Sequence, residues 1–267
     1  MCANVQTFWK AHFILNSKGG VGKSFVAFLL GQFLRERGLP VILFDADATT
    51  STFSSFAALS VTRIELMQGT QIDERRFDQI LEKVLTEEAH AVIDTGTSSY
   101  VALSNYLIEN DVHRQIAAMG KQVVVHAIIV GSGRTLIETL NDLDDLAIQL
   151  PEEVTLIAWL NEHFGAVFQN GKVFEEMEVY LNHRHRIHSV LRLPQRTPAT
   201  FGADLQEMMK RHLTFAEAIA SPDFSIMARQ RLAKSARIFS RKWTPCFEPA
   251  DVLDCDRAAD RRGCQTA

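Results

Sequence analysis

Residues 16–24 read NSKGGVGKS, and they follow a short apolar run and precede a segment with helical periodicity. A glycine-rich loop between a strand and a helix lets several backbone N–H groups converge on a phosphate at the positive end of the helix dipole. The glycines let the backbone curl without a Cβ clash, Lys23 can reach the β- and γ-phosphates, and Ser24 can ligate Mg²⁺. The stretch therefore predicts a phosphate-binding loop.

The loop departs from the general phosphate-loop pattern at two places. The pattern has glycine where this chain has Ser17, and the chain carries an additional lysine, Lys18, before the glycine pair. This additional cation indicates a narrower class than nucleotide-binding proteins in general. The nucleotide-binding residues predicted from the loop are Gly19, Gly20, Val21, Gly22, Lys23 and Ser24.

Composition bounds the remaining possibilities. The 267 residues are 46% hydrophobic, enough for one large core, and one domain is the default. The net charge of −4 gives no general attraction to nucleic acid or anionic membrane, so any such contact needs a local patch. The N-terminus has no signal-peptide pattern, and the apolar runs are far shorter than the ~20 residues of a membrane span. We expect a cytoplasmic protein.

Apolar runs alternate with segments of helical periodicity along most of the chain. Strands are expected at residues 11–15, 41–44, 91–93, 123–130, 155–160 and 189–193, with a weaker candidate at 61–67. Helices are expected at residues 24–37, 73–88, 100–109, 135–150, 172–181, 203–209 and 215–220. Several strands are apolar on both faces, as in a parallel sheet covered on both sides. We therefore predict an α/β fold: a doubly wound, mostly parallel sheet with helices on both faces and ligand chemistry at the carboxyl ends of its strands.

The composition changes near the C-terminus. Residues 224–247 contain six basic residues and no acidic one, and apolar residues recur there at helical spacing. This pattern predicts a basic amphipathic helix over residues 224–243. Docking of its apolar stripe on the domain's own core is the ordinary interpretation, with contact to a membrane or to DNA as the alternatives. We expect a P-loop ATPase domain over residues 1–243 and a disordered tail over 244–267.

Three weaker patterns have simpler interpretations. The four cysteines lie near the termini without paired metal-ligand spacing, so free thiols are preferred to a metal site; they are Cys2, Cys246, Cys255 and Cys264. Residues 183–188 (HRHRIH) are interpreted as a solvated segment rather than a metal or DNA site. Residues 131–133 (GSG) are interpreted as a strand-to-helix turn rather than a second phosphate turn.

Acidic residues at two strand ends complement the phosphate loop. Asp45 and Asp47 end the second predicted strand, and Asp94 ends the third. Mg²⁺ takes few carboxylates and keeps several waters, so Ser24, Asp45 and Asp94 are the predicted magnesium residues, and Asp94 fits best. Either Asp45 or Asp47 could orient the attacking water. The alternative for each aspartate is an ordinary strand-end or turn residue.

These residues together resemble the deviant-Walker ATPases typified by ParA and MinD. The resemblance rests on residues 18–24, Asp45, Asp47 and Asp94. It implies ATP-dependent sandwich dimers in which Lys18 reaches the partner's phosphates, Asp47 positions the lytic water and Asn161 contacts adenine. On that basis Lys18, Lys23 and Asp47 are the predicted catalytic residues, and Asn161 joins the predicted nucleotide-binding residues.

Within this class the chain is similar to the TraL family of conjugal transfer proteins over most of residues 10–235. The segments that carry the similarity are DTGTSSY (94–100) with LSNYL (103–107), WLN (159–161), LTF (213–215) and IMARQRL (226–232). Ala48 stands where proline often follows the second aspartate, and Thr50 where asparagine is common. Both lie in the loop that should sense the γ-phosphate, so these departures bear on the hydrolysis rate more than on nucleotide binding.

The sequence thus predicts a domain that binds MgATP, forms a homodimer around it and hydrolyses it slowly. The resemblance to TraL implies a role in plasmid conjugal transfer, with conjugation or plasmid-maintenance proteins as partners. Two alternatives remain. One is a non-catalytic, nucleotide-bound scaffold for transfer or partition machinery, and the other is a small-molecule ATP-dependent kinase or ligase on the same fold.

Overall fold

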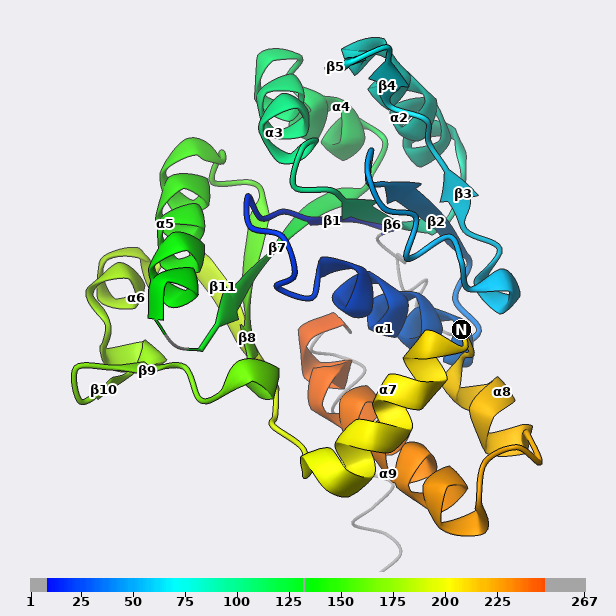
Figure 1. Ribbon diagram of the computed structural model, residues 1–267. Helices are drawn as coiled ribbons and strands as arrows, with labels where there is room; N and C mark the ends of the chain where they lie inside the picture. The colour runs from blue at the N-terminus through cyan, green and yellow to red at the C-terminus, as the bar shows by residue number, and fades with distance from the viewer. Residues whose placement is uncertain (1–8, 132, 248–267) are drawn as a thin grey trace, which may run out of the picture.

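A seven-stranded sheet forms the centre of the computed structural model, which describes residues 9–131 and 133–247 (Figure 1). In spatial order its strands are β11 (Ile187–Leu193), β8 (Thr155–Asn161), β7 (Gln122–Val130), β1 (Lys10–Ile14), β6 (His90–Thr95), β2 (Val41–Ala46) and β3 (Thr62–Arg63). Every pairing in the sheet is parallel. The predicted parallel α/β fold is therefore confirmed.

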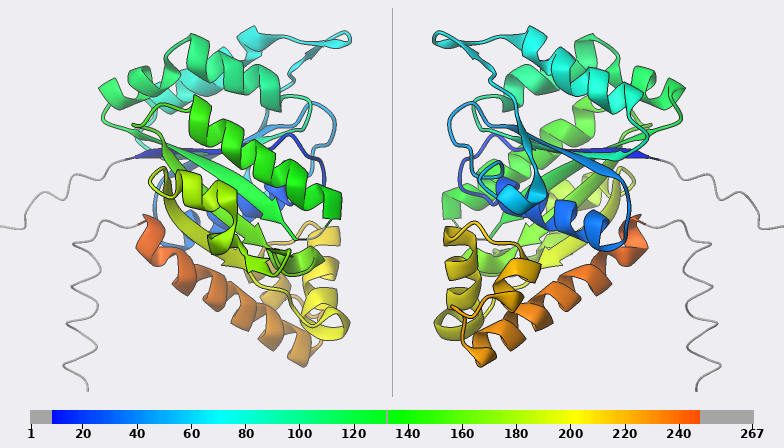
Figure 2. Two further views of the ribbon diagram at one scale, coloured as in Figure 1. Left: turned by 90° about the vertical axis from the view of Figure 1, so that its left-hand side faces the viewer. Right: turned by 90° about the vertical axis from the view of Figure 1, so that its right-hand side faces the viewer.

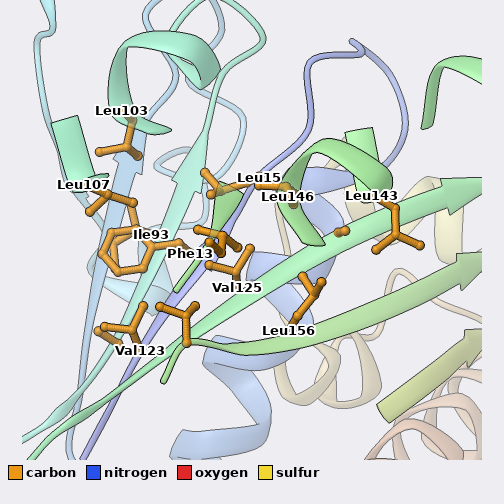
Figure 3. Close-up of a cluster of buried hydrophobic side chains, with 14 of the residues drawn as sticks. Phe13, Leu15, Ile93, Leu103, Leu107, Val123, Val125, Leu143, Leu146 and Leu156 are labelled. Atoms are coloured by element: carbon orange, nitrogen blue, oxygen red, sulfur yellow. The ribbon is translucent and has the colours of Figure 1, made fainter. Parts of the chain in front are cut away.

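Helices cover both faces of the sheet (Figures 1 and 2). One face carries α2 (Phe77–Thr86), α3 (Tyr100–Glu109), α4 (Val112–Ala118), α5 (Gly133–Gln149) and α6 (Glu178–His183). The other face carries α1 (Lys23–Glu36), α7 (Ala203–Lys210), α8 (Phe215–Ala220) and α9 (Ile226–Phe247). Because side chains alternate along a strand, Phe13 and Leu15 enter the first core (Figure 3) and Ile14 enters the second.

Most predicted elements are present with small boundary shifts. The six main strands lie within two residues of their predicted limits, and α3 and α8 have the predicted bounds. The weaker strand candidate at 61–67 supplies only β3 at the sheet edge, and its last residue begins a small separate hairpin of β4 (Met67–Gln68) and β5 (Gln71–Ile72). A 3₁₀ turn, η1 (Ala57–Leu59), precedes β3.

The helix predicted at 172–181 is wrong in its first half. Asn170 and Gly171 take positive φ values of 52° and 79°, which turn the chain back so that β10 (Lys172–Val173) pairs with β9 (Phe168–Gln169). Two-residue turns of this kind favour such residues. A 3₁₀ turn, η4 (Phe174–Glu176), then leads into α6. Another 3₁₀ turn, η3 (Glu162–Phe164), follows β8.

Two further helices differ from the prediction. The helix expected at 73–88 opens with a 3₁₀ turn, η2 (Glu74–Arg76), whose N–H at Arg75 is capped by the Asp73 carboxylate, and only then becomes α2. Helix α4 was not predicted; it starts after Asp111, which has a positive φ of 48°. Its seven residues are too few to show a helical period in the sequence.

The basic helix docks on the domain, as the sequence suggested. Phe224, Ala228, Leu232 and Phe239 are buried in the second core, against α1 and α8. Helix α9 continues to Phe247, so residues 244–247, predicted to be part of a disordered tail, are helical. The rest of that predicted tail, 248–267, lies outside the described residues. Across the described chain, no helix has both the length and the hydropathy that crossing a membrane requires.

Candidate functional site

The predicted residues gather where parallel strands end on one edge of the sheet. The loop after β1 leads into α1, and β6 lies directly beside β1 with β2 next to it. Lys23 and Ser24 form the first turn of α1, Asp45 and Asp94 are paired in register near the ends of β2 and β6, and Asn161 ends β8. In an open parallel sheet this edge is where ligands bind.

Gly22 has two reasons to be glycine. It is the residue before α1 and takes left-handed angles, with φ 104° and ψ 24°. A Cβ there would also lie 2.9 Å from Nδ2 of Asn161. That amide nitrogen donates to the carbonyl oxygen of Val21 over 2.9 Å, and its oxygen accepts the backbone N–H of His163. Asn161 therefore holds β8 against the phosphate loop; its contact with adenine stays a prediction.

Lys23 lies inside the loop. Its side chain is only 7% exposed, and Nζ donates to the carbonyl oxygen of Lys18 over 2.8 Å. Burial lowers the pKa of Lys23, and the nearby carboxylates, that of Asp94 first, oppose the change. Within the described residues this ammonium donates one hydrogen bond to a carbonyl oxygen, so it has further donors to offer an anion.

Asp94 is the most perturbed acid of the site. It is 1% exposed, and within the described residues neither carboxylate oxygen has a hydrogen bond of ordinary geometry. Burial raises the pKa of Asp94 to about 8, although the adjacent Ser24 hydroxyl opposes the rise. The Asp94 carboxylate and the Ser24 hydroxyl together offer the oxygen ligands that a hard cation prefers. A bound Mg²⁺ would lower the pKa of Asp94 again, because its charge favours the ionised carboxylate.

Asp45 is less suited to a metal than Asp94. One of its oxygens accepts the backbone N–H of Asp47 over 3.2 Å, and the other accepts that of Ser54 over 2.8 Å. Asp45 thus holds the loop after β2. Across the described residues there is no cluster of three or more His, Cys, Asp or Glu side chains that could hold a metal. The residues present fit Mg²⁺ bound by Asp94 and Ser24, with water completing its shell.

Asp47 is bound to its own loop. Its Oδ1 accepts the N–H and the hydroxyl of Thr49, both over 2.8 Å, and the N–H of Thr50 over 3.1 Å; Oδ2 accepts the Thr50 hydroxyl over 2.7 Å. Burial raises the pKa of Asp47, but these hydrogen bonds outweigh burial and bring the pKa below its usual value. Gly96 packs against this carboxylate so closely that a Cβ would lie 2.4 Å from Oδ1.

Helix α5 holds the start of the loop with two acidic side chains. Nζ of Lys18 forms an ion pair with Oε2 of Glu138 over 2.7 Å, and this contact holds the pKa of Glu138 below its usual value. One turn later Asp142 accepts Nδ2 of Asn16 and both the N–H and the hydroxyl of Ser17. The serine that departs from the general loop pattern thus donates two partly buried hydrogen bonds to Asp142.

A cavity of about 540 Å³ opens beside the loop. Gly20 and Gly22 form one wall with Asn161, and further lining comes from the chain after β11, from α7, and from Phe25 and Phe239. Most of this lining is apolar, with a few polar side chains, as in small-molecule sites of this size. The cavity and the loop together form a site with an anion-binding end and an apolar end.

Comparison with known proteins agrees with this geometry. A family model for the CobQ/CobB/MinD/ParA nucleotide binding domain matches residues 12–221. The chain belongs to this family. Two proteins named Protein TraL, both from Escherichia coli, are each 37% identical over 223 residues, which cover 84% of this chain and 92% of the relative.

Among solved structures, the MinC:MinD cell division protein complex of Aquifex aeolicus shares the fold, with a TM-score of 0.50 and 12% identity over 86% of this chain and 94% of that one. At this identity the likeness bears on the fold alone. In this member of the family, the glycine-rich loop lies between β1 and α1, as the sequence predicted.

Some site residues of this family member could not be read from the sequence. Glu138 and Asp142 contact the loop from α5, and Arg196 lines the cavity, but no motif singled them out. Asn16 belongs to the loop stretch itself, but its hydrogen bond to Asp142 was not predicted. Glu138 and Asp142 are four positions apart, which places them on one face of a helix. That spacing could have marked the face, but it does not identify the loop that the face meets.

The remaining sequence candidates have structural roles. The Arg186 guanidinium donates to the carbonyl oxygens of Leu150 and Pro151, just beyond the end of α5. His183 contacts the carboxylate of Asp144 over 2.7 Å. The segment 183–188 therefore fastens α5 to α6. Gly133, the first residue of α5, has a positive φ of 62°, in agreement with the predicted strand-to-helix turn.

Proposed function

We propose that this chain binds MgATP, hydrolyses it slowly, and uses its nucleotide state to control a homodimer. The observation that carries the proposal is the proximity of a buried cation, Lys23, to a buried carboxylate, Asp94, beside the N-terminus of α1. Within the described residues, neither oxygen of that carboxylate has a hydrogen bond of ordinary geometry. Anionic phosphates and one divalent cation together would satisfy both groups.

Each residue has a role in this scheme. The loop amides and Lys23 would bind the β- and γ-phosphates, and Ser24 and Asp94 would hold Mg²⁺, which neutralises phosphate charge. Asp47 would orient the water. Lys18 would reach the partner's phosphates in the dimer, where its charge counts most.

Lys18 must leave Glu138 to do so. Both side chains of this pair are partly exposed, and exposed ion pairs contribute little to stability, so the exchange costs little. A near-complete swing between monomer and dimer needs a differential affinity of about 5.5 kcal/mol, most of which must come from the nucleotide and its new contacts.

The test measures phosphate release and oligomeric state with ATP, ADP and no nucleotide, for the wild type and for Lys18→Ala. We expect an ATP-dependent dimer and slow phosphate release in the wild type. Lys18→Ala should bind ATP but stay monomeric in light scattering. A wild type that is monomeric at saturating ATP, or an ATP-dependent dimer in the variant, contradicts the proposed switch.

One observation favours a second function, a nucleotide-bound scaffold without turnover. The Asp47 carboxylate accepts four hydrogen bonds from Thr49 and Thr50, which leaves it little capacity to orient water. Such a scaffold would bind ATP with negligible phosphate release, even with DNA or a partner protein present. Turnover with no added acceptor would exclude both the scaffold and a kinase or ligase.

Kinship with the TraL proteins supports a role in plasmid conjugal transfer, with conjugation or plasmid-maintenance proteins as partners. Contact of α9 with DNA or a membrane would use its outward face, which carries Lys234 and Arg237, because its apolar stripe is buried. Repeating the assay with duplex DNA and with anionic vesicles tests each contact directly.

A further inference from the structure

The cavity beside the phosphate loop contains a cation that the proposed function does not use. Arg196 lies between β11 and the π-helical turn η5 (Pro198–Gly202), and it lines the cavity together with Asn161 and Gly22. Its guanidinium carbon stands 5.8 Å from the centre of the Phe201 ring. Among the described residues, neither Nε nor Nη2 of Arg196 has a hydrogen-bond partner, although both atoms are buried.

Such a side chain needs an acceptor. A guanidinium has five N–H donors and no acceptor, and a buried donor without a partner destabilises the structure. The ring of Phe201 can fix the plane of the group, since arginine stacks on aromatic faces. A flat ligand with acceptor atoms at its edge would satisfy the donors that the protein leaves unpaired.

The lining of the cavity indicates which part of a nucleotide would bind beside Arg196. Most of the lining beside Arg196 is apolar and includes Phe25, Leu193, Pro194 and Met209, with Asn161, His163 and Gln206 as further polar side chains. An apolar wall suits a purine and disfavours a triphosphate, whose charge costs too much to desolvate there. In the proposed function the phosphates bind at the loop with Lys23.

We propose that Arg196 is a specificity-determining residue that recognises the purine base by donating an N–H of its guanidinium, Nε–H or Nη2–H, to a ring nitrogen that accepts, such as N3 or N7 of adenine. The inference rests on the proposed nucleotide binding at the loop. It adds the residue that would distinguish a complete nucleotide from its phosphates alone.

Calorimetric titration with ATP and with inorganic tripolyphosphate, both with Mg²⁺, tests this. In Arg196→Met we expect the Kd for ATP to rise at least about tenfold, because charge-assisted hydrogen bonds are lost, while the Kd for tripolyphosphate stays as in the wild type. The matched control is Arg237→Met on the outward face of α9, which should leave both affinities unchanged.

The outcomes separate the two proposals. An unchanged ATP affinity in Arg196→Met, or an equal loss for ATP and tripolyphosphate, overturns the role of Arg196 and leaves nucleotide binding intact. A wild type that binds neither ligand overturns the proposed function and this inference with it. If Arg196→Met does not fold, the ratio of the Kd values for ATP and tripolyphosphate in Arg196→Lys decides, since an ammonium keeps the charge but lacks the planar guanidinium that stacks on an aromatic ring.

Discussion

Asp142 acts on the phosphate loop from another part of the chain. It is 5% exposed and accepts three hydrogen bonds, one from Asn16 and two from Ser17. Asn16 is further fixed to β7, because its amide donates to the carbonyl oxygen of Ile128 and accepts that residue's N–H. Helix α5 thereby sets the position from which the glycine turn begins.

Replacement of Asp142 by alanine should loosen that turn. We expect Asp142→Ala to lower the free energy of unfolding by about 2 kcal/mol, since hydrogen bonds to a buried charge are lost, and to weaken ATP binding as well. Urea unfolding and an ATP titration measure the two effects. The neighbouring Asp145 is exposed on the same helix, and Asp145→Ala should change neither. Equal ATP affinity in the wild type and in Asp142→Ala would show that the turn forms without this anchor.

The residue scale also shows where prediction from sequence stops. Lys23, Ser24 and Asp94 could be placed in one site because a loop motif and strand ends fix them to the same edge of the sheet. Asp142 and Arg196 could not, because their roles depend on which distant segment packs against them. Helical spacing predicts which face of a helix carries a side chain, but it does not predict which other segment that face will contact.

Among the elements, α9 shows how far periodicity can carry a prediction. Its 22 residues span about 33 Å, and apolar side chains recur at the spacing that keeps them on one face. That stripe packs on α1 and α8, where Phe239 stands 6.1 Å from Phe215 and 6.4 Å from Phe25, measured between ring centres. The helix thus fills the second core and also lines the cavity through Phe239.

Leu232 tests the docking of α9. It is 1% exposed in the second core, and Leu232→Ala should lower the free energy of unfolding by about 2–5 kcal/mol, the cost of a cavity in a packed core. Met227 on the same helix is 58% exposed, and Met227→Ala should stay within about 0.5 kcal/mol of the wild type. Urea unfolding followed by circular dichroism compares them. Similar values for the two variants would mean that α9 leaves the core in solution.

The hairpin of β9 and β10 was harder to predict than α9. Its strands have two residues each, too few for an alternating pattern, and the turn signal of Asn170 and Gly171 lay inside a stretch interpreted as a helix. Just before the hairpin the chain packs closely on the end of β7, because a Cβ on Gly131 would lie 2.3 Å from the carbonyl oxygen of Gly165. Packing of this kind leaves no periodic trace in a sequence.

Across the whole sheet, a line of buried polar rings crosses four strands. Trp159 on β8 donates its Nε1–H to Nδ1 of His126 on β7 over 2.8 Å, and Nε2 of His126 lies 3.0 Å from Nδ1 of His12 on β1. His90 on β6 stacks beside His12. A His126 ring that accepts from the indole at one nitrogen and donates to His12 at the other is neutral, so the arrangement needs uncharged imidazoles.

Acid should therefore destabilise the fold. Burial lowers the pKa of His126 to about 3, that of His90 to about 4, and that of His12 well below its usual value. Unfolding frees these rings to take up three protons below about pH 6.5. Asp94, with its pKa raised to about 8, already holds one proton in the folded state and opposes the trend. Between about pH 6.5 and pH 4 the unfolded state therefore binds two protons more than the folded state. As the pH is lowered through this range, the free energy of unfolding should fall by at most about 2.7 kcal/mol per pH unit.

Urea unfolding at pH 7 and at pH 5 measures this fall. His126→Gln keeps an acceptor for Trp159 but cannot take up a proton, so its loss of stability between the two pH values should be smaller than in the wild type. His188 on β11 is exposed, and His188→Gln should lose as much as the wild type. If His126→Gln loses as much as His188→Gln does, the buried rings are not what makes this protein sensitive to acid, and the titrating groups lie at its surface.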